Sequence, residues 1–212
     1  MSCIYIGRMR TEDIIMNVKS LSIKEMTIVS ILGAIIFVMG WTPIGMIPLT
    51  LILSATIIHV PVIIGALVMG PKVGLILGLI MGLTSLSRAW IAPQSPLNLI
   101  FMNPIIAVLP RLFIGIAAYY SYHFVRKLLK NQILALTIAS VSGSLANTIL
   151  TLGTIFLIKN GQTFVLDEMS STVSKALLGT IILTNGIPEV IVTALITVPI
   201  VLAIKKVNHI KE

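Results

Sequence analysis

Residues 177–204 read LLGTIILTNGIPEVIVTALITVPIVLAI, and the stretch contains a single charged side chain, Glu189. A helix of about 20 apolar residues crosses the hydrocarbon core of a membrane, so this stretch is long enough to span one. The whole chain has the same character, because 57% of its residues are hydrophobic and only 10% are charged. A soluble domain carries roughly 25% charged residues. The composition therefore predicts an all-α integral membrane protein.

Five further apolar segments precede this one, and together they predict a six-transmembrane-helix bundle. The expected spans are Lys24–Gly40, Leu53–Met69, Val73–Trp90, Leu97–Val125, Ile133–Ile158 and Leu177–Ile204. They leave room for one membrane domain at 24–207, an N-terminal segment at 1–23, a tail at 208–212 and outer loops at 41–52, 91–96 and 159–176.

Lysine and arginine are distributed unevenly between the two ends of these spans. One end would hold the groups at 8–24, 72, 126–130 and 205–211, and the other end only Arg88, Lys159 and Lys175. Cytoplasmic loops carry an excess of Lys and Arg, so both termini are expected to be cytoplasmic, in a multi-pass protein of the bacterial cell (plasma) membrane. The net charge of +8 is then a topology signal, and no nucleic-acid partner is expected.

The first outer connection, 41–52, reads WTPIGMIPLTLI and combines two prolines and a glycine with apolar residues. Such a stiff, apolar loop suits a lid that folds back over a cavity, and an ordinary turn is the alternative.

Small residues recur at helical spacing on two spans. Gly74, Gly78 and Gly82 lie four residues apart, which places them on one face where another backbone can approach closely. Ser30 and Ala34 form a similar pair on the first span. These small faces would meet either helices of the same chain or a separate membrane protein.

Two opposite charges fall at similar depth inside the spans. Arg111 lies in the fourth and Glu189 in the sixth. Because an unpaired charge at that depth costs about 2.5–3.5 kcal/mol on insertion scales, the two are expected to form a buried pair. Two interpretations remain open: the pair fixes the register of the helices, or one of its members faces a ligand.

Four asparagines accompany these charges, namely Asn98, Asn103, Asn147 and Asn185. Asparagine is a poor lipid-facing residue, so each is expected to point inward. Taken singly, each is more typical of a hydrogen bond between helices than of a ligand contact. Taken together, they outline a polar cavity open to the outside.

Arg88 and Trp90 are expected at the rim of this cavity. The forked guanidinium of Arg88 suits a carboxylate, and an arginine that only reaches toward the membrane surface is the alternative. His59 is interpreted as a packing residue, and Pro61 is expected to bend the second span.

Several chemical motifs are missing from the sequence. It has no phosphate-binding loop of the P-loop type, no His-Glu-x-x-His and no cluster of histidine and cysteine ligands. These absences argue against an enzyme, and no cofactor or metal is expected.

One further pattern is a set of short segments spread along the chain. They are 54–66 SATIIHVPVIIGA, Gly70-Pro71, the glycines at 74, 78 and 82, 82–85 GLTS, 101–104 FMNP, Pro110-Arg111 and 185–189 NGIPE. Over residues 25–205 the chain resembles the substrate-binding S components of energy-coupling-factor (ECF) vitamin transporters, and it is most similar to the pantothenate-type branch.

This resemblance implies a six-helix bundle with a substrate pocket near the outer face, covered by the first and third outer loops. It implies a vitamin ligand, here pantothenate, and a transmembrane T subunit with two ATPase subunits that energise uptake. The family's Ala-xxx-Ala contact with the T subunit would correspond to Ser30 and Ala34, with serine in place of the first alanine. Two alternatives remain: another vitamin (folate, riboflavin or a purine-like precursor), and a scaffold subunit without a ligand.

Overall fold

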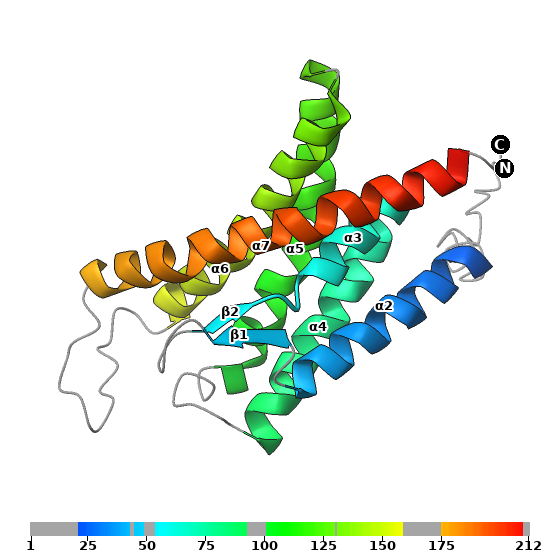
Figure 1. Cartoon of the computed structure of the whole chain (residues 1–212). Helices are drawn as coiled ribbons and strands as arrows, with labels where there is room; N and C mark the ends of the chain where they lie inside the picture. The colour runs from blue at the N-terminus through cyan, green and yellow to red at the C-terminus, as the bar shows by residue number, and fades with distance from the viewer. Residues whose placement is uncertain are drawn as a thin grey trace, which may run out of the picture.

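The computed structural model describes residues 21–42, 45–48, 54–92, 101–129, 131–158 and 175–209. Within these residues lie six helices and one antiparallel pair of strands (Figure 1). In chain order they are α2 (Ile23–Trp41), β1 (Met46–Pro48), β2 (Ser54–Thr56), α3 (Val60–Met69), α4 (Pro71–Ile91), α5 (Pro104–Leu128), α6 (Gln132–Ile158) and α7 (Lys175–His209). Five of the helices are long and apolar enough to cross a membrane, which confirms the prediction of a helical membrane bundle.

The helix ends follow local sequence signals. Ser22 and Glu25 form a capping box that begins α2. Asn103 caps α5 by accepting a hydrogen bond from the backbone N–H of Ile105, and Pro104 follows at the first helical position. Gly70 has a φ of 102°, a conformation that favours glycine, and it turns the chain sharply from α3 into α4.

The second expected span differs from the prediction. A continuous helix was expected over Leu53–Met69, but the described part of this stretch is the short strand β2 followed by α3, which has ten residues. Pro61 was expected to bend the helix and instead lies in its first turn, where its missing N–H is not needed. At about 1.5 Å per residue, α3 alone is too short to cross a membrane.

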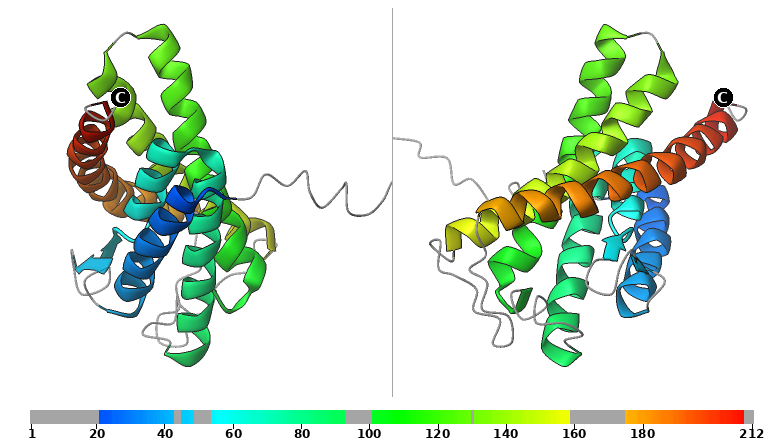
Figure 2. Two further views of the ribbon diagram at one scale, coloured as in Figure 1. Left: turned by 90° about the vertical axis from the view of Figure 1, so that its right-hand side faces the viewer. Right: turned by 60° about the vertical axis from the view of Figure 1, so that its left-hand side comes forward.

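The short helix α3 lies at the centre of the bundle. Each residue from Val60 to Leu67 is buried, and α3 packs against α2, α4, α5 and α7. A helix that is apolar on all sides is stable only where neighbours surround it. Outside it, α5 and α6 pack on each other and extend together beyond the other helices, as both views in Figure 2 show.

The glycine face of α4 packs directly on α5, as the spacing predicts. A Cβ at Gly74 would meet the Cα of Gly115 at 3.1 Å, and a Cβ at Gly82 would meet the Cα of Val108 at 2.8 Å. A Cβ at Gly78 would overlap the backbone carbonyl of Arg111. We call these contacts the α4–α5 seam. They fix the position of the helix turn from which the Arg111 side chain projects.

Candidate functional site

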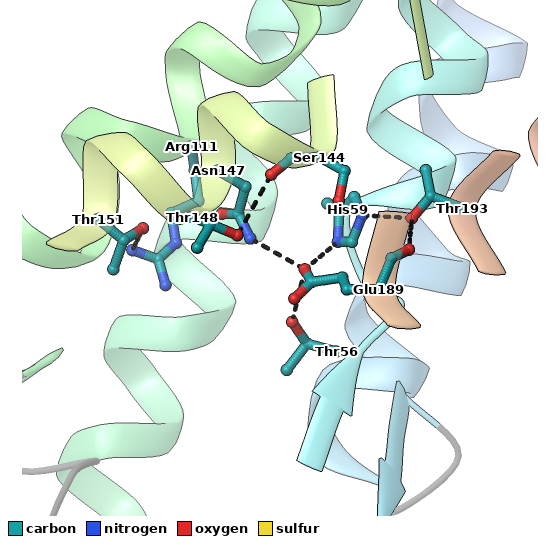
Figure 3. A network of polar contacts seen from close by, with 9 residues as sticks. All are labelled: Thr56, His59, Arg111, Ser144, Asn147, Thr148, Thr151, Glu189 and Thr193. Atoms are coloured by element: carbon teal, nitrogen blue, oxygen red, sulfur yellow. Dashed lines mark hydrogen bonds and ion pairs between the residues drawn. The ribbon is translucent and has the colours of Figure 1, made fainter. Parts of the chain in front are cut away.

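Buried and half-buried polar side chains from α5, α6, α7, β2 and the turn before α3 meet in one layer of the bundle (Figure 3). We call this group the polar cluster, and its members are Thr56, His59, Arg111, Ser144, Asn147, Thr148, Thr151, Glu189 and Thr193. The cluster brings together three of the residues expected from the sequence: Arg111, Asn147 and Glu189. Its members come from segments far apart in the chain, so the fold must be complete before the cluster exists.

Glu189 lies in the middle of the cluster and is only 5% exposed. Three side chains converge on its Oε1 atom (Figure 3). Thr56 donates a hydrogen bond from Oγ1 at 3.3 Å, Asn147 donates from Nδ2 at 3.4 Å, and Nδ1 of His59 lies 3.2 Å away. Each partner comes from a different element, so Glu189 ties β2, α6 and the start of α3 to α7.

The ion-pair partner of Glu189 is His59, and not Arg111 as expected. The guanidinium of Arg111 donates from Nη1 to the carbonyl oxygen of Ile106 at 2.8 Å and to Oγ1 of Thr151 at 3.3 Å. Its Cζ atom also lies 4.7 Å from the ring centre of Phe101, within the range of a cation–π contact. Arg111 and Glu189 still attract each other electrostatically, but across the cluster and without a direct bond.

Several buried polar atoms of the cluster have no hydrogen-bond partner among the described residues. They include Nε of Arg111, Oδ1 of Asn147, Oγ of Ser144 and Nδ1 of His59, which lies within ion-pair distance of Glu189 but makes no hydrogen bond. A buried polar atom left unpaired costs about 1–3 kcal/mol. Some hydroxyls elsewhere avoid this cost by donating to their own helix, as Ser140 does to the carbonyl oxygen of Leu136. The cluster thus combines a cationic donor, an amide acceptor and a hydroxyl, a set that suits a small polar anion.

The other expected site residues lie elsewhere or outside the described part. Arg88 is buried and donates from Nη1 to the carbonyl oxygen of Gly40 at 2.8 Å, which joins α4 to the end of α2. Trp90 is 66% exposed and donates to the carbonyl oxygen of Met102. Asn103 caps α5. Asn98 falls outside the described residues, and Asn185 lies in α7 at a position whose side chain is not described.

The sequence did not single out Thr56 or Thr193, and it indicated His59 as a packing residue and not as a member of a polar cluster. His59 is fully buried, and its Nε2 atom lies 2.7 Å from Oγ1 of Thr193. The signal was present, since a histidine in an apolar segment requires a partner just as a charged residue does. Its partners, Glu189 and Thr193, however, lie 130 and 134 positions away in sequence, and no local pattern links them.

The chain matches the family model of the ECF transporter substrate-specific component over residues 24–201. It therefore belongs to the family of ECF transporter substrate-specific components, which are transporter subunits, and it is a multi-pass membrane protein.

Two relatives support this assignment. The pantothenic acid transporter PanT of Lactococcus lactis subsp. cremoris is 33% identical over 168 residues, which cover 73% of this chain and 79% of the relative. The pantothenate transporter PanT of Leuconostoc mesenteroides subsp. mesenteroides is 30% identical over 165 residues, which cover 75% and 79%.

Proposed function

We propose that this chain is the S subunit that binds pantothenate for an ATP-driven ECF importer, taking it from the outside and delivering it inward. The observation that carries the proposal is Arg111, whose buried Nε has no hydrogen-bond partner among the described residues and lies in the same layer as two other such atoms, Oδ1 of Asn147 and Oγ of Ser144. Pantothenate carries one carboxylate, two hydroxyls and an amide. An arginine with amide and hydroxyl neighbours suits these groups, and both relatives are named as pantothenate transporters.

A thermal unfolding experiment on the detergent-purified chain tests the proposal against a panel of water-soluble vitamins. A ligand at about 100 times its Kd stabilises the fold by about 2.7 kcal/mol, which gives a readable shift. We expect a shift with pantothenate and none with the other vitamins. A shift with folate or riboflavin instead would keep the family and reject the substrate. No shift with any vitamin would favour a scaffold subunit without a ligand.

The role of Arg111 is tested by Arg111→Ala. We expect the affinity for pantothenate to fall by about tenfold or more, which is about 1.4 kcal/mol, because the carboxylate loses its cationic partner. Arg126→Ala is the matched control, since Arg126 lies exposed in the last turn of the same helix. Equal affinities for the two variants would reject Arg111 as the carboxylate ligand.

The proposed topology has six spans with both termini in the cytoplasm. The five long helices alone would give an odd number of membrane crossings and would place the termini on opposite sides. The segment formed by β2 and α3 supplies the sixth crossing. This segment is partly extended, and other helices enclose it. The start of α2 and the end of α7 lie on the same side of the molecule in Figure 1, which supports this arrangement.

The single cysteine, Cys3, is a natural probe of this topology. We expect a membrane-impermeant maleimide to label Cys3 only after the cells are permeabilised, and labelling in intact cells would reverse the orientation.

The proposed partners are a transmembrane T subunit and two ATPase subunits. Ser30 and Ala34 lie exposed on one face of α2, beside exposed apolar side chains such as Ile31. A face of small residues lets another helix approach closely. We expect Ala34→Leu to abolish co-purification with the T subunit while pantothenate binding is kept. Gly153→Leu, at an exposed position of α6 with no neighbouring atom within 4 Å of its Cβ site, is the control for added bulk.

A further inference from the structure

The contacts of His59 determine where its protons lie. Oγ1 of Thr193 is 2.7 Å from the carbonyl oxygen of Glu189, a contact in which the hydroxyl must donate. A hydroxyl has only one proton to give. The contact of 2.7 Å between the same Oγ1 and Nε2 of His59 is therefore favourable only if Nε2–H donates. The proton on Nε2 is thus fixed by the helix hydrogen bond of Thr193.

The other ring nitrogen, Nδ1, faces Oε1 of Glu189 at 3.2 Å. In a neutral imidazole with its proton on Nε2, Nδ1 carries a lone pair. A lone pair facing a carboxylate oxygen at this distance inside the bundle would be repulsive. We infer that His59 and Glu189 hold one proton between them in addition to the proton on Nε2, so that the pair as a whole is electrically neutral.

The shared proton sets the charge that a ligand meets in the polar cluster. With the proton in place, the His59–Glu189 pair contributes nothing and Arg111 leaves a net charge of +1. Without it, the carboxylate of Glu189 cancels Arg111. A monocarboxylate entering a site of low polarity needs a compensating positive charge. His59 is therefore a positioning and specificity-determining residue: by neutralising Glu189 it keeps Arg111 available for an anion. This inference rests on the proposed function, since pantothenate is such an anion.

The surroundings of the pair support this charge balance. Arg111 of α5 is the charged group in the same layer, and α6 presents the neutral amide of Asn147. On the other helices packed against α3, the described charged residues lie near the ends: Lys24 and Glu25 on α2, Lys72 and Arg88 on α4, and Lys205 and Lys206 on α7. Lys205 lies over the ring of Tyr122, and Arg88 donates to Gly40.

A rescue experiment tests the shared proton. His59→Gln removes the proton source and leaves the carboxylate of Glu189 to cancel Arg111, so we expect pantothenate affinity to fall by about tenfold or more. Adding Glu189→Gln removes that negative charge, and we expect the double variant to recover most of the lost affinity. If the double variant binds no better than His59→Gln alone, the inference is wrong. If the wild-type chain does not bind pantothenate, the proposed function has failed first.

A measurement on the wild-type chain keeps the test independent of how the variants fold. Nitrogen-15 NMR of histidine-labelled protein distinguishes a ring nitrogen with a proton from one with a free lone pair. The chain has three histidines, and the spectrum of His59→Gln assigns the signal of His59. At neutral pH we expect Nε2 to be protonated and Nδ1 to show a protonated or shared-proton signal. A free lone pair on Nδ1 would overturn the inference.

Discussion

The α4–α5 seam and the polar cluster meet at Arg111, yet they are built in opposite ways. In the seam, glycines bring backbone against backbone and leave no room for a single added carbon. In the cluster, several buried polar atoms have no hydrogen-bond partner in the part of the chain that the structure describes. Close packing on one side of α5 thus fixes the place from which the guanidinium of Arg111 projects on the other side. Changes in the seam should therefore lower stability first, and changes in the cluster should lower binding first.

The largest effect is expected in the seam, from Gly78→Leu. A Cβ at this position overlaps the carbonyl of Arg111 and lies 3.2 Å from the Cα of Leu112, so α4 and α5 must separate. Overpacking a tight interior costs about 1–3 kcal/mol, and backbone gives way less easily than side chains. We expect a lower thermal unfolding temperature and, because Arg111 moves with its helix, weaker pantothenate binding.

Gly153→Leu is the control for this variant, because the space beside Gly153 is open. We expect it to unfold close to the wild-type temperature. If both glycine variants unfold at the wild-type temperature, close packing at the seam does not stabilise the bundle. The proposed difference between the seam and the polar cluster would then be wrong.

The sequence predicted the seam better than the cluster. Glycines spaced four residues apart on one helix form a local pattern, which indicates the close approach of another backbone. The structure confirms it, because Gly74, Gly78 and Gly82 contact α5. Arg111 and Glu189 were also found, because a charge in an apolar segment stands out. Their pairing was wrong, because the order of charges along the chain does not say which neighbour reaches a carboxylate first.

The second span shows another limit of the sequence. The stretch from Leu53 to Met69 is apolar throughout, and hydropathy cannot distinguish a membrane-spanning helix from a strand followed by a buried helix. Pro61 carried the missing information, since a proline two residues after His59 is typical of a helix start. The strand also explains why Thr56, a residue the sequence did not single out, reaches Glu189.

An intermediate effect is expected from Arg88→Ala, which tests whether Arg88 supports the fold, as the seam does, or binds the ligand, as the cluster is proposed to do. Its hydrogen bond to the carbonyl oxygen of Gly40 is buried, and a hydrogen bond from a charged donor contributes about 1.5–3 kcal/mol. We expect the ligand-free protein to unfold at a lower temperature, with a smaller loss of affinity than in Arg111→Ala. An affinity loss equal to that of Arg111→Ala, with unchanged stability, would instead make Arg88 a direct ligand of the carboxylate.

The smallest effects are expected from two buried hydroxyls that both lack a hydrogen-bond partner among the described residues, Ser144 and Thr197. Ser144 belongs to the polar cluster, whereas Thr197 lies one helical turn beyond Thr193 on α7. Removing an unpaired buried hydroxyl relieves its desolvation penalty, so Ser144→Ala and Thr197→Val should both leave the ligand-free protein as stable as the wild type or slightly more stable.

Binding should separate the two hydroxyls. We expect Ser144→Ala to weaken pantothenate binding by roughly threefold to tenfold, about 0.6–1.4 kcal/mol, because the ligand loses a hydrogen bond. We expect Thr197→Val to leave the affinity unchanged, and titration calorimetry on both variants measures the difference. The reverse pattern would mean that the ligand reaches past Thr193 along α7. The unpaired hydroxyl of Ser144 would then be a packing defect, and the polar cluster would no longer mark the boundary of the site.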